Sequence, residues 1–290
     1  MITKILKWTG IVTGTLIVFF LAFYTYIYFN TESRINKIYD IQVQNLNIPT
    51  DSLSLAKGKH LAEIRACTGC HGTDFSGGMA FADDQSPIGI LYSSNITKGR
   101  GGVNYTDADW VRALRHGLGK DSRSLWFMPS HEIYQISNQD MAALIGYVKS
   151  RPPVDRENHN KSLKPLGRIL TFFNEFPLLP AEKIDHDAVP VDAVTVSVTP
   201  EYGKYLAITC TGCHSENFKG AEAHAPGEPP IPDISSTGNL GKWTSDGFVN
   251  TLQTGKRPDG KELNPAMPWK AFNYTHEELN AIYTYLHALP

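Results

Sequence analysis

Two short cysteine and histidine motifs contain the residues best suited to chemistry. The five letters Cys-Thr-Gly-Cys-His occur at 67–71 and again at 210–214. A bare C-x-x-C is also found in zinc knuckles and thiol redox pairs, but C-x-x-C-H is the attachment signature of c-type haem. In that chemistry two thiols form thioethers with the porphyrin, and the adjacent histidine ligates the iron. The two copies use all four cysteines of the chain, so none is left for a disulfide or a zinc site.

The motifs therefore predict two covalently bound haem c groups. The thioether sulfurs are expected from Cys67, Cys70, Cys210 and Cys213, and the first iron ligands from His71 and His214. Attachment of this haem takes place on the outer side of an energy-transducing membrane. We therefore expect the bulk of the chain to be exported.

The second iron ligand decides whether such a site transfers electrons or binds small molecules. The five methionines are Met1, Met79, Met128, Met141 and Met267. Met128 and Met267 follow the motif histidines by 57 and 53 residues, and each precedes a proline. A residue before proline is pushed out of the α region, so both thioethers should project from loops. We predict Met128 and Met267 as axial ligands, with a thioether merely packed on the porphyrin as the alternative and His131 and His276 as competing nitrogens.

Histidine and methionine ligation raises the reduction potential and fills the coordination sphere. The prediction is thus an electron relay and not an enzyme: no catalytic residue and no small-molecule substrate are expected. A net charge of -2 provides no basic field for nucleic acid. The alternative is a diheme cytochrome c peroxidase-like enzyme, which needs one accessible iron and is disfavoured by a Met-Pro in both halves.

The elements that must position these residues form an internal repeat. Gly58–Ala62 matches Gly203–Ala207 before the motifs, and Thr106–Leu114 matches Thr244–Leu252 after them. The threonines are expected helix N-caps, and Gly117 and Gly255 the C-caps. A closing helix is predicted over 137–149 and over 275–287, each after its Met-Pro. The expected fold is all-α, with two cytochrome c-like haem domains in tandem after a single N-terminal transmembrane helix.

Matching glycines predict one packing detail of the repeat. Gly58 and Gly203 on the opening helices would admit the rings of Tyr147 and Tyr285 on the closing helices. The alternative is that both glycines are ordinary helix residues.

The N-terminus reads as a membrane anchor. No charged residue occurs from Trp8 to Thr31, and a bilayer span needs about 20 apolar residues. A cleaved signal peptide is the alternative, but its apolar region is shorter and ends in small residues. Here the run ends in Tyr24–Phe29, a sequence typical of an aromatic interface belt. Lys4 and Lys7 precede the span, which favours a cytoplasmic N-terminus.

The predicted organisation has five segments. They are the cytoplasmic N-terminus and transmembrane anchor (1–31), a stalk (32–50), the first cytochrome c domain (51–152), a structured linker (153–198) and the second cytochrome c domain (199–290). The linker contains an apolar patch from Ile169 to Leu179. We expect it to pack along the first domain or at the seam between domains, with a partner subunit or the membrane surface as the alternative contact.

These residues resemble a known family. From about Leu55 to Pro290 the chain is similar to class I c-type cytochromes in tandem diheme form, through its two C-x-x-C-H motifs, late Met-Pro pairs and closing helices. The sequence from Ser94 to Gly117 resembles that of cytochrome subunits of membrane-bound periplasmic dehydrogenases. Those subunits often have three haems and a C-terminal anchor, whereas this chain has two motifs and an N-terminal apolar segment. By this resemblance Cys67, Cys70, Cys210 and Cys213 are thioether sites, and His71, Met128, His214 and Met267 are axial ligands.

The expected partners follow from the anchor and the chemistry. They are the lipid bilayer, through the N-terminal helix, and redox proteins such as a respiratory complex, an oxidase or a dehydrogenase. The expected location is the cytoplasmic (inner) membrane, single-pass, with the haem domains on the periplasmic or outer face.

Overall fold

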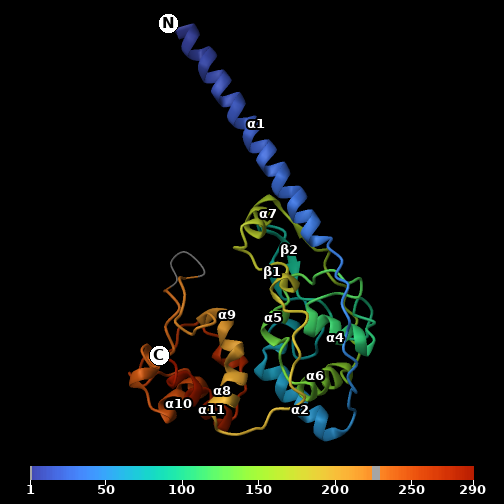
Figure 1. The fold of residues 1–290 in the computed structure, drawn as a ribbon, viewed down its shortest axis with the longest axis vertical. Helices are drawn as coiled ribbons and strands as arrows, with labels where there is room; N and C mark the ends of the chain where they lie inside the picture. Colours follow the sequence, from blue (N-terminus) through green and yellow to red (C-terminus); the bar gives the residue numbers. More distant parts are fainter. Residues whose placement is uncertain (1, 224–228) are drawn as a thin grey trace.

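The computed structural model describes residues 2–223 and 229–290, so Met1 lies outside it. The described chain is mainly helical, with one small sheet (Figure 1). The first elements in order are α1 (Ile2–Ile35), α2 (Ser52–Ile64), α3 (Cys67–His71), β1 (Ala80–Ala82), β2 (Gly89–Tyr92), α4 (Asp107–His116), α5 (Ser130–Ile133) and α6 (Asn138–Lys149). Next come β3 (Ser162–Leu163), α7 (Pro165–Phe172) and the 3-10 turn η1 (Pro180–Lys183). The last are α8 (Pro200–Ala207), η2 (Ile208–Cys210), α9 (Thr211–His214), η3 (Asn239–Lys242), α10 (Ser245–Thr254), η4 (Trp269–Ala271) and α11 (His276–His287).

Helix α1 projects away from the rest of the molecule (Figure 1). It has 34 residues, which corresponds to roughly 50 Å. Within the described residues it is the one helix long and apolar enough to cross a membrane, and nearly all of its apolar side chains are exposed. Such a surface needs an apolar surrounding, since water solvates it poorly.

The repeat predicted from the sequence is a repeat of helices. Thr106 and Thr244 cap α4 and α10 as expected, each accepting a hydrogen bond from a backbone N–H in the first turn. Gly117 and Gly255 end the same helices in the left-handed region, at φ 63° and 77°. Glycine adopts this conformation without a Cβ penalty, which explains its choice at both helix ends.

The opening and closing helices of each half pack at the predicted glycines. A Cβ built on Gly58 would lie 2.0 Å from the Ala143 carbonyl oxygen and 2.7 Å from the Cβ of Tyr147. On Gly203 it would lie 1.9 Å from the Ala281 carbonyl oxygen and 2.8 Å from the Cβ of Tyr285. The predicted close approach of the paired helices is therefore confirmed, but the atoms nearest each glycine are an alanine carbonyl and the tyrosine Cβ, not the tyrosine ring.

A small antiparallel sheet, in the order β1-β2-β3, covers part of the first half. Its third strand belongs to the segment between the halves, where Leu163 pairs with Gly89. Further along the contact, the Asn95 side chain donates to the Val154 carbonyl at 2.8 Å. The sequence did not predict these strands, because two to four residues are too few to show an alternating pattern.

The buried apolar residues of both halves form one continuous cluster. Leu61 and Ile64 of α2 belong to it together with Leu206 of α8 and Ile282 of α11. The two C-x-x-C-H motifs directly follow α2 and α8, so the shared core also fixes where the two motifs lie.

Candidate functional site

The second motif opens into an apolar cavity of about 540 Å³. Cys210 ends η2, and Cys213 and His214 lie on α9. All three residues line the cavity, and Met267 lines it as well. Trp243, Phe248, Leu252 and Leu286 supply further apolar lining. The structure thus brings together the four residues predicted for this site.

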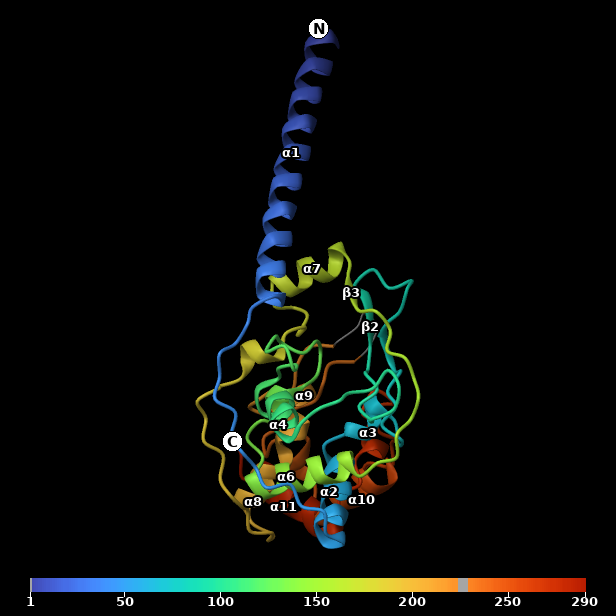
Figure 2. The same ribbon diagram turned by 90° about the vertical axis from the view of Figure 1, so that its right-hand side faces the viewer.

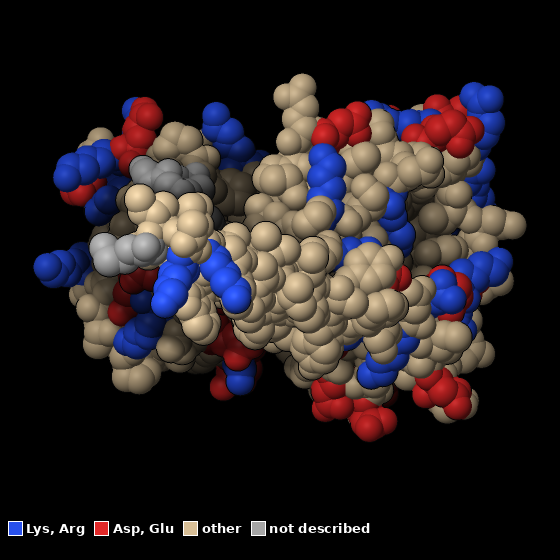
Figure 3. Space-filling view, turned by 90° about the horizontal axis from the view of Figure 1, so that it is seen from above, with Lys and Arg blue, Asp and Glu red and all other residues tan. Residues whose placement is uncertain are grey.

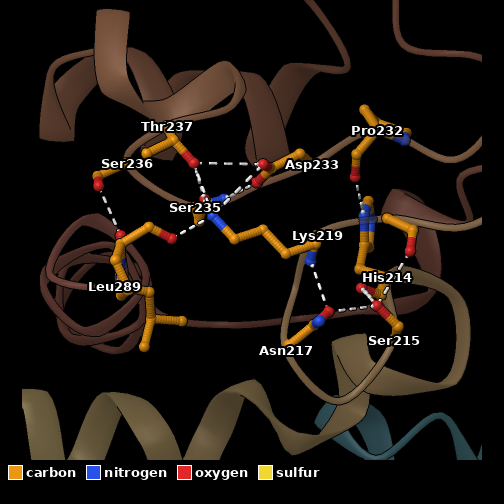
Figure 4. A network of polar contacts seen from close by, with 12 residues as sticks. His214, Ser215, Asn217, Lys219, Pro232, Asp233, Ser235, Ser236, Thr237 and Leu289 are labelled. Carbon is orange, nitrogen blue, oxygen red and sulfur yellow. Dashed lines mark hydrogen bonds and ion pairs between the residues drawn. The ribbon is translucent and has the colours of Figure 1, made fainter.

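Both motif histidines are held in the same way. His71 Nδ1 lies 2.9 Å from the Ser94 carbonyl oxygen, and His214 Nδ1 lies 2.9 Å from that of Pro232 (Figure 4). A carbonyl oxygen only accepts, so each Nδ1 has the hydrogen and donates it. The Nε2 lone pair is left free to bind a metal. Burial lowers the pKa of both imidazoles, which favours this neutral form.

The loop with Pro232 is itself fixed by a lysine. Lys219 Nζ donates to Ser235 Oγ at 2.9 Å and to Thr237 Oγ1 at 2.6 Å (Figure 4). These bonds join the segment after the motif to the segment with the accepting carbonyl. His214 is therefore held through a polar network and not by its own turn alone.

In the first site, Cys67, Cys70 and His71 share the single turn α3. Met128 is half-buried and packs against the same core cluster as Cys67. Burial raises the pKa of the Cys67 thiol to about 12, and that of Cys210 to about 12 as well. These sulfurs face the apolar interior in both halves, where a porphyrin edge would lie.

Each predicted methionine ligand sits in a local turn of the same kind. The Met128 carbonyl accepts from Ser130 N–H at 2.7 Å, and the Met267 carbonyl accepts from Trp269 N–H at 2.9 Å. Each lies outside the helices, as expected for a residue before proline. The competing nitrogens differ from each other: His276 is exposed at the start of α11, whereas His131 is partly buried on α5.

The cavity at the second motif fits a haem. Its volume lies within the range of about 300 to 1,000 Å³ typical of cofactor pockets. Arg257 lines it, and the buried Arg257 Nε has no hydrogen-bond partner among the described residues. A haem propionate would satisfy that donor. When bound, the group supplies one-electron chemistry; Cys210, Cys213, His214 and Met267 are the residues that would hold it.

Sequence reasoning missed Arg65, which links the two motifs. Its side chain is 6% exposed and donates to the Tyr205 carbonyl and Thr209 Oγ1, both at 3.0 Å, and to the Leu206 carbonyl at 3.3 Å. A signal was present: four residues separate Ala62 from Cys67, but only two separate their counterparts in the second copy. Arg65 lies in this longer spacer and makes the contact between halves.

Sequence reasoning also missed a carboxyl group from the first half that touches the second motif. A Cβ built on Gly212 would lie 2.6 Å from Glu132 Oε1. Burial raises the pKa of Glu132 to about 7, and Lys183 partly opposes this. His60 forms another link between halves, through Glu278 Oε1 at 2.8 Å. That bond raises the pKa of His60 against the opposing effect of burial.

Comparison with known proteins identifies the family of the chain. The cytochrome c family model matches residues 55–152 and again 200–290, which together make up more than half of the sequence. The chain belongs to the cytochrome c family. Membership implies covalently bound haem c, in agreement with the motif and cavity geometry.

Several similar proteins are cytochrome subunits of dehydrogenases. The chain is 26% identical over 278 residues to the cytochrome c subunit of the quinone alcohol dehydrogenase of Gluconacetobacter polyoxogenes, covering 83% of this chain and 57% of the relative. It is 27% identical over 263 residues to the fructose dehydrogenase cytochrome subunit of Gluconobacter japonicus, covering 82% and 53%. It is 35% identical over 115 residues to the gluconate 2-dehydrogenase cytochrome c subunit of Pantoea cypripedii, covering 37% and 25%. The chain thus spans little more than half the length of the first two relatives.

The comparisons confirm the predicted family, the tandem all-α architecture and the class of protein. The chain is a cytochrome c similar to cytochrome subunits of dehydrogenases, as predicted from its motifs. The individual thioether and axial residues stay predictions, supported by the geometry above.

Proposed function

We propose that the chain is a membrane-anchored diheme cytochrome c, the electron-transfer subunit of a dehydrogenase or another respiratory redox complex. It would accept single electrons from a catalytic partner and pass them to an acceptor in or near the membrane. The observation that supports this best is the duplicated histidine geometry. Each Nδ1 donates to a carbonyl, so that two imidazoles present a free Nε2 next to a paired cysteine motif.

The opposite ligands would be Met128 and Met267. A soft, neutral thioether favours the ferrous iron and raises the potential. Met267 lines the same cavity as His214, which supports a filled coordination sphere there. A filled sphere leaves no position for peroxide and therefore weighs against the peroxidase-like alternative.

Membrane attachment is proposed from α1. Its exposed apolar surface extends from Ile2 to Phe29, with aromatic residues at Trp8 and at Tyr24–Phe29 near the two ends. Aromatic side chains of this kind sit at the two membrane–water interfaces. The haem domains would lie on the periplasmic or outer face of the cytoplasmic membrane, next to electron donors and acceptors of the respiratory chain.

Absorption spectra of ligand variants test the proposal. The purified full chain should contain two haems, and its ferric form should show the weak sulfur-to-iron band at the red end of the spectrum. Met128→Ala and Met267→Ala should each lose part of that band and bind carbon monoxide in the ferrous state. Met79→Leu is the matched control, because Met79 is a half-exposed loop methionine and should leave the spectrum unchanged. An unchanged band in both alanine variants would show that the ligands are wrong.

A further inference from the structure

Helix α7 exposes large apolar side chains on the side that faces away from the protein. With about 100° of rotation per residue, the two sides of the helix differ in composition. One side has small residues, Gly167 and Thr171, which are buried against the body. The opposite side has Leu166, Ile169, Leu170 and, directly after the helix, Phe173. Leu166 is 41% exposed and Phe173 is 53% exposed, whereas Ile169 and Leu170 are partly buried. A surface helix of a water-soluble protein shows the reverse arrangement.

Helix α7 is attached to the lower part of α1. The Phe172 ring packs edge-on against Tyr26 at 5.7 Å and against Phe23 at 6.4 Å, measured between ring centroids. Arg168 lies 4.2 Å from the centre of the Tyr28 ring and pairs with Glu32 at 2.6 Å. Figure 2 shows α7 lying crosswise to α1 where α1 meets the body. The outward side of α7 is therefore continuous with the apolar surface of α1.

The contact lies where the apolar part of α1 gives way to charged residues. Toward the start of α1 lie its exposed apolar side chains, and at its end Arg34 pairs with Glu182 at 2.6 Å and donates to the Thr171 carbonyl of α7 at 2.9 Å. Seen from the end where α1 begins, acidic side chains lie mostly at the rim of the molecule, whereas uncharged surface and several Lys and Arg side chains occupy the middle (Figure 3). Tyr24, Tyr26 and Tyr28 mark the same level as an aromatic belt.

We propose that α7 lies in the membrane–water interface, with the apolar side formed by Leu166, Ile169, Leu170 and Phe173 inserted into the lipid. The occupant of this surface is the lipid bilayer, and the inference rests on the proposed anchoring by α1. A helix that crosses the membrane alone leaves the attached domains free to tilt. With α7 lying flat beside it, two contacts in different directions hold the haem domains at one orientation to the bilayer.

Thiol accessibility in vesicles tests this contact. Single cysteine variants of the full, haem-loaded chain are reconstituted in phosphatidylcholine vesicles and reacted with a charged, water-soluble methanethiosulfonate. Phe173→Cys and Leu166→Cys probe α7. Phe20→Cys, near the middle of α1, reports on the anchor, and Leu53→Cys, 83% exposed on the distant helix α2, reports on water. All four positions should tolerate substitution because none of these side chains belongs to the buried core.

We expect the Phe173→Cys and Leu166→Cys thiols to react at least roughly tenfold more slowly than the Leu53→Cys thiol, because lipid excludes the reagent and suppresses the thiolate. Reaction as fast as for Leu53→Cys, with Phe20→Cys still protected, would overturn the proposal for α7 and leave the anchor standing. Fast reaction of Phe20→Cys would overturn the anchor and this proposal together. Protection of α7 seen only in native membranes would assign the surface to a protein partner and would equally overturn it.

Discussion

The close approach of α8 and α11 at Gly203 makes a quantitative prediction for Gly203→Ala. The added Cβ would lie 1.9 Å from the Ala281 carbonyl oxygen, whereas real Cβ contacts are essentially never under 3.0 Å. Helices α8 and α11 must therefore separate by about 1 Å, and the obstacle is backbone, which cannot rotate away. The separation weakens the packing of fully buried side chains such as Leu206 and Ile282.

Two effects of opposite sign set the size of the change. Overpacking a core costs about 1–3 kcal/mol, and a clash with backbone belongs at the upper end. The exchange of glycine for alanine within a helix stabilises the folded state by about 1 kcal/mol. The expected net loss is about 2 kcal/mol in the free energy of unfolding. The two halves share one core and are expected to unfold together. For a unit of roughly 150–250 residues, that loss corresponds to a melting temperature lower by roughly 4–8 °C.

Thermal unfolding of the detergent-solubilised full chain, followed by far-UV circular dichroism, measures this loss. Gly58→Ala should behave alike, because its Cβ would meet the Ala143 carbonyl oxygen at 2.0 Å. Gly247→Ala on α10 is the matched control: the nearest atoms to its Cβ belong to side chains, at 3.2 and 3.3 Å, and can yield by a few tenths of an ångström. Equal melting temperatures for Gly203→Ala and Gly247→Ala would refute the packing argument.

Three further predictions concern contacts between the halves. The bond to Glu278 raises the pKa of His60 above its ordinary 6.5. The stabilisation of the folded chain by this bond is therefore complete below pH 6.5 and is lost as the pH rises through the raised pKa. His60→Gln should remove this pH-dependent fall in the denaturation midpoint. Because burial raises the pKa of Glu132 to about 7, the stability of the folded chain falls as the pH rises from 4.5 to about 7. In guanidinium titrations above pH 7, Glu132→Gln should be more stable than the natural chain by about 1–3 kcal/mol. An unaltered pH profile would contradict the burial of this carboxyl. Arg65→Gln should lose about 2–4 kcal/mol and separate the unfolding of the two halves into two calorimetric transitions, whereas one transition at the original temperature would exclude its linking role.

Much of the candidate site could be predicted because its chemistry is local in the sequence. Cys67, Cys70 and His71 fall within one helical turn, so their spacing alone puts them on one structure. The caps of α4 and α10 are equally local, since a threonine oxygen and a glycine φ act within a few residues. Gly58 and Gly203 were predictable for another reason: a repeat makes the same packing constraint visible twice.

Other features were decided by the tertiary structure. Strand β3 pairs with β2 because the segment after α6 folds back along the first half, and the few residues of β1 to β3 show no periodicity. Ser94 and Pro232 orient the histidines through backbone carbonyls, which any residue type provides and no motif can reveal. The contact of Glu132 with Gly212 joins residues 80 positions apart, and its raised pKa comes from burial at the seam.

The sequence by itself determined the haem motifs, the tandem helical repeat and the long apolar helix, because each is a pattern of residues close together in the chain. Only the fold determined how these parts are joined: Arg65 across the seam, the Met267 cavity and the outward apolar side of α7. The physical reason is that burial, which sets both the cost of a charge and the direction of an apolar side chain, depends on segments distant in sequence.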